Sequence, residues 1–185
     1  MTIIGITGTD GGGKGTVVDY LVDVNGFVHY SARALWVEEI QHRELPVNRA
    51  NMRLMANDLR KTHGNDYLIT EYVRRARTDG HERFVIESLR ATAEVETLKR
   101  EGGLLLAVDA DQQVRYERIQ ARASESDAIS FEEFVEHEAL EMNDPDPNGM
   151  QKATVIAMAD YTIMNNGILE ELHAQIEDVL QKIGI

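Results

Sequence analysis

The sequence predicts an α/β fold in which a five-stranded parallel sheet carries helices on both faces. Short apolar runs recur along the chain, helical patterns separate them, and a glycine-rich loop joins the first run to the first helix. Alternating strands and helices favour a parallel sheet, and continuous apolar runs are typical of strands covered on both faces. We expect strands at residues 3–6, 26–30, 83–87, 104–109 and 161–164.

The helices are predicted by apolar residues at helical spacing. A first helix is expected at residues 16–23, and loops are expected at 124–130 and 143–150. No linker or change of composition divides the chain, so we expect one domain over residues 1–185. The clearest helical pattern lies near the C-terminus and consists of Leu169, Leu172, Ile176, Val179, Leu180 and Ile183.

Composition and charge restrict the classes of function. The net charge of −13 disfavours binding to nucleic acid, and the absence of cysteine excludes disulfides and thiolate metal sites. No apolar run approaches the roughly 18 residues of a membrane span. The N-terminus enters a strand at once without a basic region, so we expect no signal peptide, no membrane partner and a cytoplasmic protein. Only five of the 19 basic residues are lysines. The others are arginines, which bind phosphate through bidentate hydrogen bonds.

The glycine-rich loop carries the strongest functional signal. Its sequence from Gly8 to Thr16 is Gly-Thr-Asp-Gly-Gly-Gly-Lys-Gly-Thr, between a strand and a helix. Such a loop wraps backbone N–H groups around a polyphosphate, and its lysine reaches the β- and γ-phosphates. Gly15 separates Lys14 from Thr16, whereas the general pattern has Ser or Thr directly after the lysine. A turn without a ligand is the alternative, but the glycines and their strand-to-helix context favour ATP.

Glu87 and Arg90 follow an apolar run that reads as a buried strand. Ligands of open α/β sheets bind beyond the C-terminal ends of the strands. A carboxylate there holds Mg²⁺ through water or acts as a base, and Arg90 is placed to clamp an acceptor phosphate. The alternative is a salt bridge at the start of the next helix, which the neighbouring glycine loop makes the weaker interpretation.

Two rows of arginines are spaced to lie on helical faces. The first row follows Asn48 and consists of Arg49, Arg53 and Arg60. These side chains can point into a cleft, or they can form a solvated face that pairs with nearby carboxylates. Arg115, Arg118 and Arg122 precede the loop at 124–130. Arginines at a mobile segment can close over a transferring phosphoryl group. We favour this role for Arg118 and Arg122 over an exposed paired stripe, and less so for Arg115.

Two further features are less specific. The turn Asn165-Asn166-Gly167 follows the last strand, and its backbone borders an adenine ring or simply forms a turn. The histidines are scattered without a helical pair, so we interpret them as structural or surface residues.

With these motifs in place, the chain resembles the adenylate kinase-like nucleoside monophosphate kinases and the related dephospho-CoA kinases. Residues 29–35 lie where the monophosphate kinases carry His-x-Ser-Thr-Gly-Asp-Leu, although Ala32, Arg33 and Ala34 depart from it. Residues 85–92 resemble Asp-Gly-Phe-Pro-Arg-Thr, one residue shorter, and residues 159–167 are closest to dephospho-CoA kinases.

The resemblance implies a three-layer P-loop kinase fold, ATP and Mg²⁺. It also implies a helical insertion at about residues 31–80 that binds the acceptor, and a short lid at about 123–150. Dephospho-CoA kinases use an aspartate base after the second strand, where this chain has Ser31-Ala32-Arg33. A monophosphate acceptor is already anionic and needs only positive charge.

We therefore predict an ATP-dependent phosphotransferase that acts on a nucleoside monophosphate or similar nucleotide. A dephospho-CoA kinase with Glu87 as base, and a slowly hydrolysing nucleotide-binding switch, are the alternatives. The predicted catalytic residues are Lys14, Glu87, Arg90, Arg118 and Arg122; those for ATP are Gly8, Asp10, Gly11, Gly12, Gly13, Lys14, Gly15, Thr16, Asn166 and Gly167; those for the acceptor are Arg33, Arg49, Arg53 and Arg90; and those for Mg²⁺ are Thr16 and Glu87.

Overall fold

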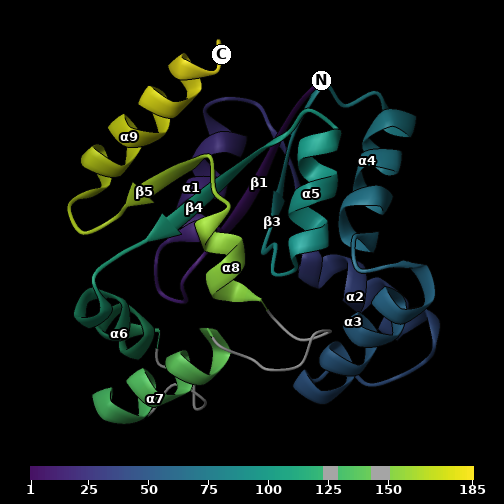
Figure 1. Cartoon of the computed structure of the whole chain (residues 1–185), viewed down its shortest axis with the longest axis horizontal. Helices are drawn as coiled ribbons and strands as arrows, with labels where there is room; N and C mark the ends of the chain where they lie inside the picture. Colours follow the sequence, from purple (N-terminus) through teal and green to yellow (C-terminus); the bar gives the residue numbers. More distant parts are fainter. Residues whose placement is uncertain (123–128, 143–150) are drawn as a thin grey trace.

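The computed structural model describes residues 1–122, 129–142 and 151–185, and its architecture is a three-layer α/β sandwich (Figure 1). Five parallel strands form one sheet in the order β2-β3-β1-β4-β5. This confirms the predicted fold class. The strands are β1 (Thr2–Gly8), β2 (Val28–Ser31), β3 (Arg83–Glu87), β4 (Leu104–Asp109) and β5 (Tyr161–Met164).

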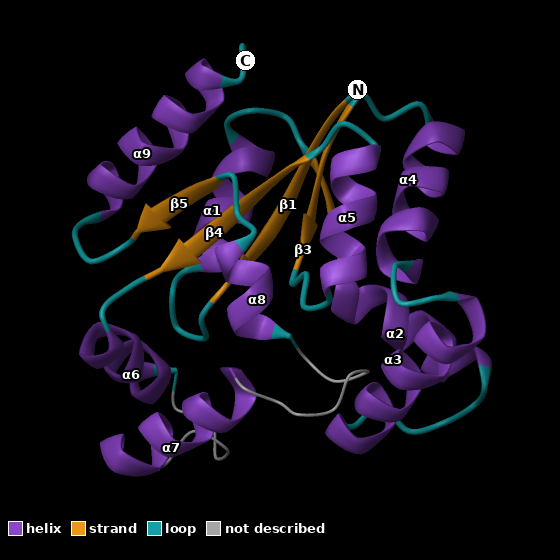
Figure 2. Cartoon of the chain, in the orientation of Figure 1, coloured by secondary structure: helices purple, strands orange, loops and turns teal. Residues whose placement is uncertain are grey.

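The helices alternate with the strands along the chain and lie on both sides of the sheet (Figure 2). No helix within the described ranges is long and apolar enough to cross a membrane. The helices are α1 (Lys14–Asp23), α2 (Ala32–His42), α3 (Arg49–His63), α4 (Tyr67–Asp79), α5 (Thr92–Arg100), α6 (Gln112–Ala121), α7 (Phe131–Met142), α8 (Lys152–Ala157) and α9 (Leu169–Lys182).

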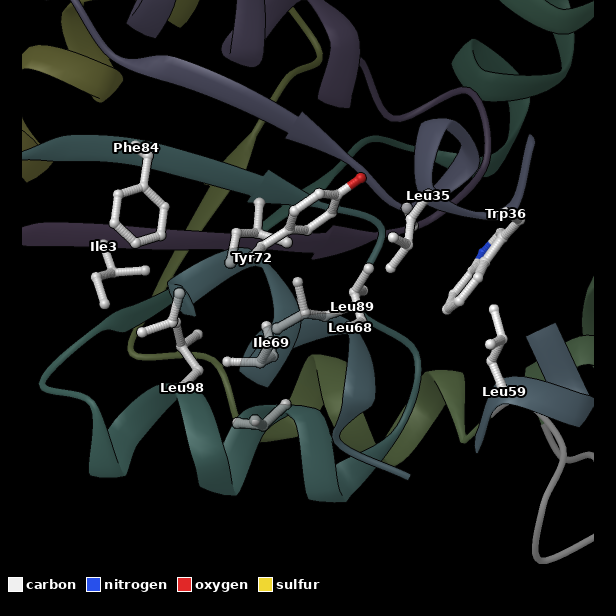
Figure 3. Close-up of a cluster of buried hydrophobic side chains, with 14 of the residues drawn as sticks. Ile3, Leu35, Trp36, Leu59, Leu68, Ile69, Tyr72, Phe84, Leu89 and Leu98 are labelled. Atoms are coloured by element: carbon white, nitrogen blue, oxygen red, sulfur yellow. The ribbon is translucent and has the colours of Figure 1, made fainter. Parts of the chain in front are cut away.

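Two apolar cores sandwich the sheet. Alternate residues of β1 point to opposite faces, so Ile3 joins one core and Ile4 and Ile6 join the other. The core around Ile3 takes side chains from α2, α3, α4, α5 and α8, and Figure 3 shows Phe84 beside Ile3 in it. The opposite core takes side chains from α1 and α9. Burial on both faces explains why the strands read as continuous apolar runs.

Element boundaries differ from expectation around the first helix. The strand expected at 3–6 is longer and spans Thr2–Gly8. The strand expected at 26–30 begins at Val28, because Gly26 has φ of 70° and the N–H of Phe27 bonds back to Leu21 O at the end of α1. Helix α1 begins at Lys14 rather than Thr16, since Val17 N already bonds to Gly13 O.

The loops expected at 124–130 and 143–150 lie mostly outside the described residues. Ser130 is described, and it starts α7 by a reciprocal cap in which Ser130 N donates to Glu133 Oε2 and Glu133 N donates to Ser130 Oγ. The proposed lid at about 123–150 therefore contains one described helix, which packs Phe131 and Phe134 against Tyr116 of α6.

Candidate functional site

The C-terminal ends of four neighbouring strands bring the candidate site together. Strand β1 runs into the glycine loop, β3 ends at Glu87, β4 ends at Asp109, and Asn165 follows β5 directly. Register pairs Glu87 with Ser31 at the end of β2. Parallel strands thus collect, at one edge, polar residues that are distant in sequence.

The backbone of the loop requires glycine at its tightest positions. Gly8 has φ of 130°, and a Cβ there would lie 2.0 Å from Val108 O. Gly13 has φ of 99° at the N-terminus of α1, and a Cβ there would lie 2.2 Å from Asn165 Nδ2. Any side chain at these positions would be strained and would collide with its neighbours. The loop is therefore built from bare backbone that a ligand can approach closely.

Lys14 lies over the loop that it follows. Its Nζ donates to Thr9 O at 2.7 Å and to Gly8 O at 3.2 Å, and lies 3.7 Å from Asp10 Oδ1. Burial lowers the pKa of Lys14, and the Asp10 carboxylate opposes this shift. An ammonium group that rests on backbone carbonyls is held at the loop and can turn to an anion.

Two polar side chains fasten the loop to the sheet. Thr9 Oγ1 donates to Asp109 Oδ1 at 2.5 Å, and Asn165 Nδ2 donates to Gly12 O at 3.0 Å. Asn165 N in turn donates to Asp109 O at 2.7 Å. Asp109 was not among the predicted site residues, and Asn165 was expected only as part of the turn beside an adenine ring. Both stand at strand ends, which is the signal that points to them.

The predicted residues Asn166 and Gly167 follow in the same turn. Asn166 Oδ1 accepts the Asp111 N–H at 2.7 Å, which ties the turn after β5 to the turn after β4. Gly167 lines the pocket described below.

Asp10 interacts with several cations, of which Lys152 was not predicted from the sequence. Lys152 of α8 is 2% exposed, and its Nζ lies 2.9 Å from both Asp10 Oδ2 and Glu141 Oε2. Burial alone would raise the pKa of Asp10, but the charges of Lys152, Lys14 and Arg90 hold it well below its usual value. The guanidinium of Arg90 is therefore close enough to the loop to act on its charges. No motif in the sequence marked Lys152.

Glu87 is surrounded by polar partners at the end of β3. Its Oε1 accepts the Ser31 hydroxyl at 3.0 Å and lies 3.6 Å from His29 Nε2. The contact with His29 lowers the pKa of Glu87, burial opposes this, and Ser31 and Lys14 add to the lowering. The carboxylate is thus held ionised beside the lysine-bearing loop.

A pocket of about 400 Å³ opens between the loop, α6 and the start of α9. Arg118 of α6 and Arg122, which directly follows this helix, line this pocket, and their guanidinium groups favour an anionic ligand. Its lining residues are Gly11, Gly13, Thr16, Arg118, Ala121, Arg122, Asn165, Gly167, Leu169 and Leu172.

Arg115, the third member of the same helical row, is buried and structural. It pairs with Glu138 of α7, donates from Nε to Ala110 O at 2.7 Å, and lies over the Phe134 ring. The expected alternative of an exposed stripe is wrong for this residue, because α7 covers it.

The arginines predicted to hold an acceptor are less concentrated. Arg33 and Arg53 are exposed on α2 and α3, and the side chain of Arg49 lies outside the described part of the chain. Arg60 turns inward, with Nη2 at 3.4 Å from Glu94 Oε1. The charges of Lys14 and Arg90 thus act on the loop, Glu87 lies near enough to interact with Lys14, and Arg33 and Arg53 remain exposed.

Comparison with known proteins places this geometry in a wider group. Residues 4–141 match the family AAA_18, described as an AAA domain. A UPF0200 protein of Methanothermobacter thermautotrophicus is 29% identical over 186 residues, covering 100% of this chain and 92% of that protein.

Two solved structures share the fold over nearly the full length of both chains. Shikimate kinase from Bacteroides thetaiotaomicron matches with a TM-score of 0.62 at 13% identity, covering 100% of this chain and 99% of that chain. Dephospho-CoA kinase from Campylobacter jejuni matches with a TM-score of 0.59 at 13% identity, covering 99% and 98%. At such identities the likeness concerns the fold alone.

Proposed function

We propose that this chain, which belongs to the AAA_18 family and has the fold of P-loop kinases, is an ATP-dependent phosphotransferase. Its acceptor would be a nucleoside monophosphate or a similar nucleotide. The observation that carries the proposal is the pocket at the glycine loop, which is lined by Arg118 and Arg122 as well as by Gly11, Gly13 and Thr16. An anionic ligand on the loop would pair with these arginines and with the loop cations.

ATP is placed with its β- and γ-phosphates in the loop from Gly8 to Thr16. Lys14 turns from the loop carbonyls to these phosphates, and the base lies toward Gly167 with Leu169 as an apolar wall. The residues that would hold Mg²⁺ are Thr16, whose exposed side chain lines the pocket, and Glu87 through water. A bound Mg²⁺ would neutralise charge on the β- and γ-phosphates.

The transfer brings two anions together, so catalysis depends mainly on the cations of the site, which neutralise their charge. An oxygen of the acceptor phosphate forms a bond to the γ-phosphorus, and the bond from that phosphorus to the bridging oxygen breaks, which leaves ADP. Arg90 holds the acceptor phosphate beside the loop, together with Arg33, Arg49 and Arg53. Lys14, Arg118 and Arg122 neutralise the charge of the transferring group.

The contacts that lower the pKa of Glu87 support one of the two kinds of acceptor. A general base works best when its pKa lies near the operating pH, whereas the contacts of Glu87 with His29 and Ser31 lower its pKa. This favours a carboxylate that supports the metal over one that removes a proton from a hydroxyl. A phosphate acceptor is therefore preferred over the hydroxyl of dephospho-CoA.

The test is a coupled assay of ADP formation with ATP, Mg²⁺ and a panel of nucleoside monophosphates plus dephospho-CoA. We expect at least one monophosphate to stimulate turnover. Lys14→Ala should lower this turnover by about a hundredfold or more, because it removes a charge aimed at the transferring group. Lys61→Ala, which removes an exposed lysine of α3, is the control. Tight ATP binding without stimulation by any acceptor would instead support a nucleotide-binding switch.

A further inference from the structure

Arg90 belongs to a short segment, Ser88–Ala91, whose backbone is fixed from several sides. Leu89 N donates to Ile6 O at 3.1 Å, and Thr7 Oγ1 donates to Leu89 O at 3.0 Å. Ser88 adopts φ of 68°, a left-handed conformation that is uncommon for residues other than glycine. Such a conformation persists only where the surroundings enforce it. The position of Arg90 is thus set by its neighbours rather than by a regular element.

Glu94 in the first turn of α5 supplies the remaining contacts. Its side chain is fully buried, and its Oε2 accepts the N–H groups of Arg90 at 2.7 Å and of Ala91 at 3.0 Å. Ala91 precedes the helix and has no side-chain oxygen to serve as a cap. Glu94 therefore takes over the capping role and, in the same contact, holds the backbone of Arg90.

Burial raises the pKa of Glu94, and Arg60 of α3, on the other side of the carboxyl group, opposes this shift together with the two backbone N–H groups. Arg60 Nη2 lies 3.4 Å from Glu94 Oε1, and its guanidinium lies 5.8 Å from the ring of Trp36 in α2. Trp36 packs next to Leu59 in the core shown in Figure 3. The Nε of Arg60 is buried and has no hydrogen-bond partner in the part of the chain that the structure describes. One ion pair thus connects the helices of residues 31–80 with the segment that carries Arg90.

We propose that Glu94 and Arg60 are positioning residues, which hold the backbone of Arg90 and link its placement to α3. The inference rests on the proposed function, because there Arg90 holds the acceptor phosphate. Arg60 and Glu94 touch neither the glycine loop nor the pocket between α6 and α9. Their loss should therefore weaken acceptor binding and leave ATP binding intact, a separation that a general loss of stability would not produce.

The experiment compares wild type with Glu94→Gln and Arg60→Met in the full chain. Calorimetry measures the affinities for ATP and, separately, for AMP, CMP, GMP and UMP as monophosphate probes. For the monophosphate that binds, we expect a loss of about tenfold or more in both variants, since a charge-assisted contact is removed. The affinity for ATP should stay within about twofold, as for a substitution distant from that site. If Glu94→Gln fails to fold, Arg60→Met alone tests the positioning role.

Thr97→Val is the matched control on the same helix. Thr97 is 4% exposed, and its hydroxyl donates to Asp66 Oδ2 at 2.7 Å without touching the Arg90 segment. It should lose stability and keep both affinities. Equal weakening of the monophosphate by Thr97→Val, or unchanged monophosphate affinity in Glu94→Gln and Arg60→Met, would overturn the positioning role.

Amide hydrogen exchange without ligand separates this inference from the proposed function. The amides of Arg90 and Ala91 should exchange faster in Glu94→Gln than in wild type, because glutamine has one acceptor oxygen where Glu94 uses Oε1 for Arg60 and Oε2 for these two N–H groups. Faster exchange in a protein that binds no monophosphate would support the positioning of Arg90 and contradict the proposed function. Unchanged exchange would overturn the positioning itself.

Discussion

At the scale of single residues, the glycine loop shows how backbone geometry and charge combine. Gly13 allows the chain to turn into α1 against Asn165, and Lys14 then lies back over Thr9 O at 2.7 Å. Asp10 lies between Lys14 and Lys152 and contacts both cations at the loop. The carboxylate thus gives these two cations an anionic partner.

Gly13→Ala tests the backbone part of this description. Alanine at this position would have to adopt φ of 99°, and its Cβ would lie 2.2 Å from Asn165 Nδ2. We expect a stability loss of about 1–3 kcal/mol and weaker ATP binding, measured by denaturant unfolding and calorimetry. Gly15→Ala is the stability control, because nothing lies within 4 Å of its Cβ and alanine favours the helix. Equal stabilities of the two variants would contradict the argument.

At the scale of elements, helices α2 and α4 are joined by a chain of charges outside the proposed chemistry. Arg75 donates to Glu71 Oε1 at 2.7 Å within α4 and to Glu38 Oε2 at 2.7 Å on α2. Arg74 adds a contact to Glu71 at 2.8 Å. The contacts with Arg74 and Arg75 lower the pKa of Glu71 to about 2, against the opposing effect of burial.

This shift predicts how stability depends on pH. A carboxyl whose pKa is lowered by folding stabilises the protein above its unfolded pKa, near 4.5, and loses that contribution as the pH falls toward 2. Glu71→Gln should therefore be less stable than wild type by about 1 kcal/mol at pH 7, since the arginines reach solvent. Denaturant unfolding between pH 7 and pH 3 should show this difference shrinking. A difference that grew toward low pH would reverse the assigned sign.

The elements also show what sequence patterns can and cannot predict. The strands at 83–87, 104–109 and 161–164 were predicted with the observed bounds, because burial on both faces leaves uninterrupted apolar runs. Lys152 was missed because its burial depends on Asp10 and Glu141, which contact it only in the folded chain. Local spacing also failed for Arg115, which α7 covers from a later part of the sequence.

At the scale of the whole molecule, the sheet order places the glycine loop between β3 and β4. The loop thereby gains Glu87 and Arg90 on one side and Asp109 with α6 on the other. The motif predicts a phosphate site at this loop, which stays a prediction, whereas the anchoring of the loop by Asn165 follows from the pairing of β4 with β5. Topology, rather than any single motif, supports two anionic ligands placed end to end.

The most direct test of this arrangement is a crystal structure with a bisubstrate analogue in which two adenosines are joined through a polyphosphate. We expect the phosphates to run from the loop at Lys14 to the guanidinium of Arg90, with one adenosine in the pocket beside Arg118. A complex in which the second adenosine extends into solvent and Arg90 contacts no phosphate would contradict the account.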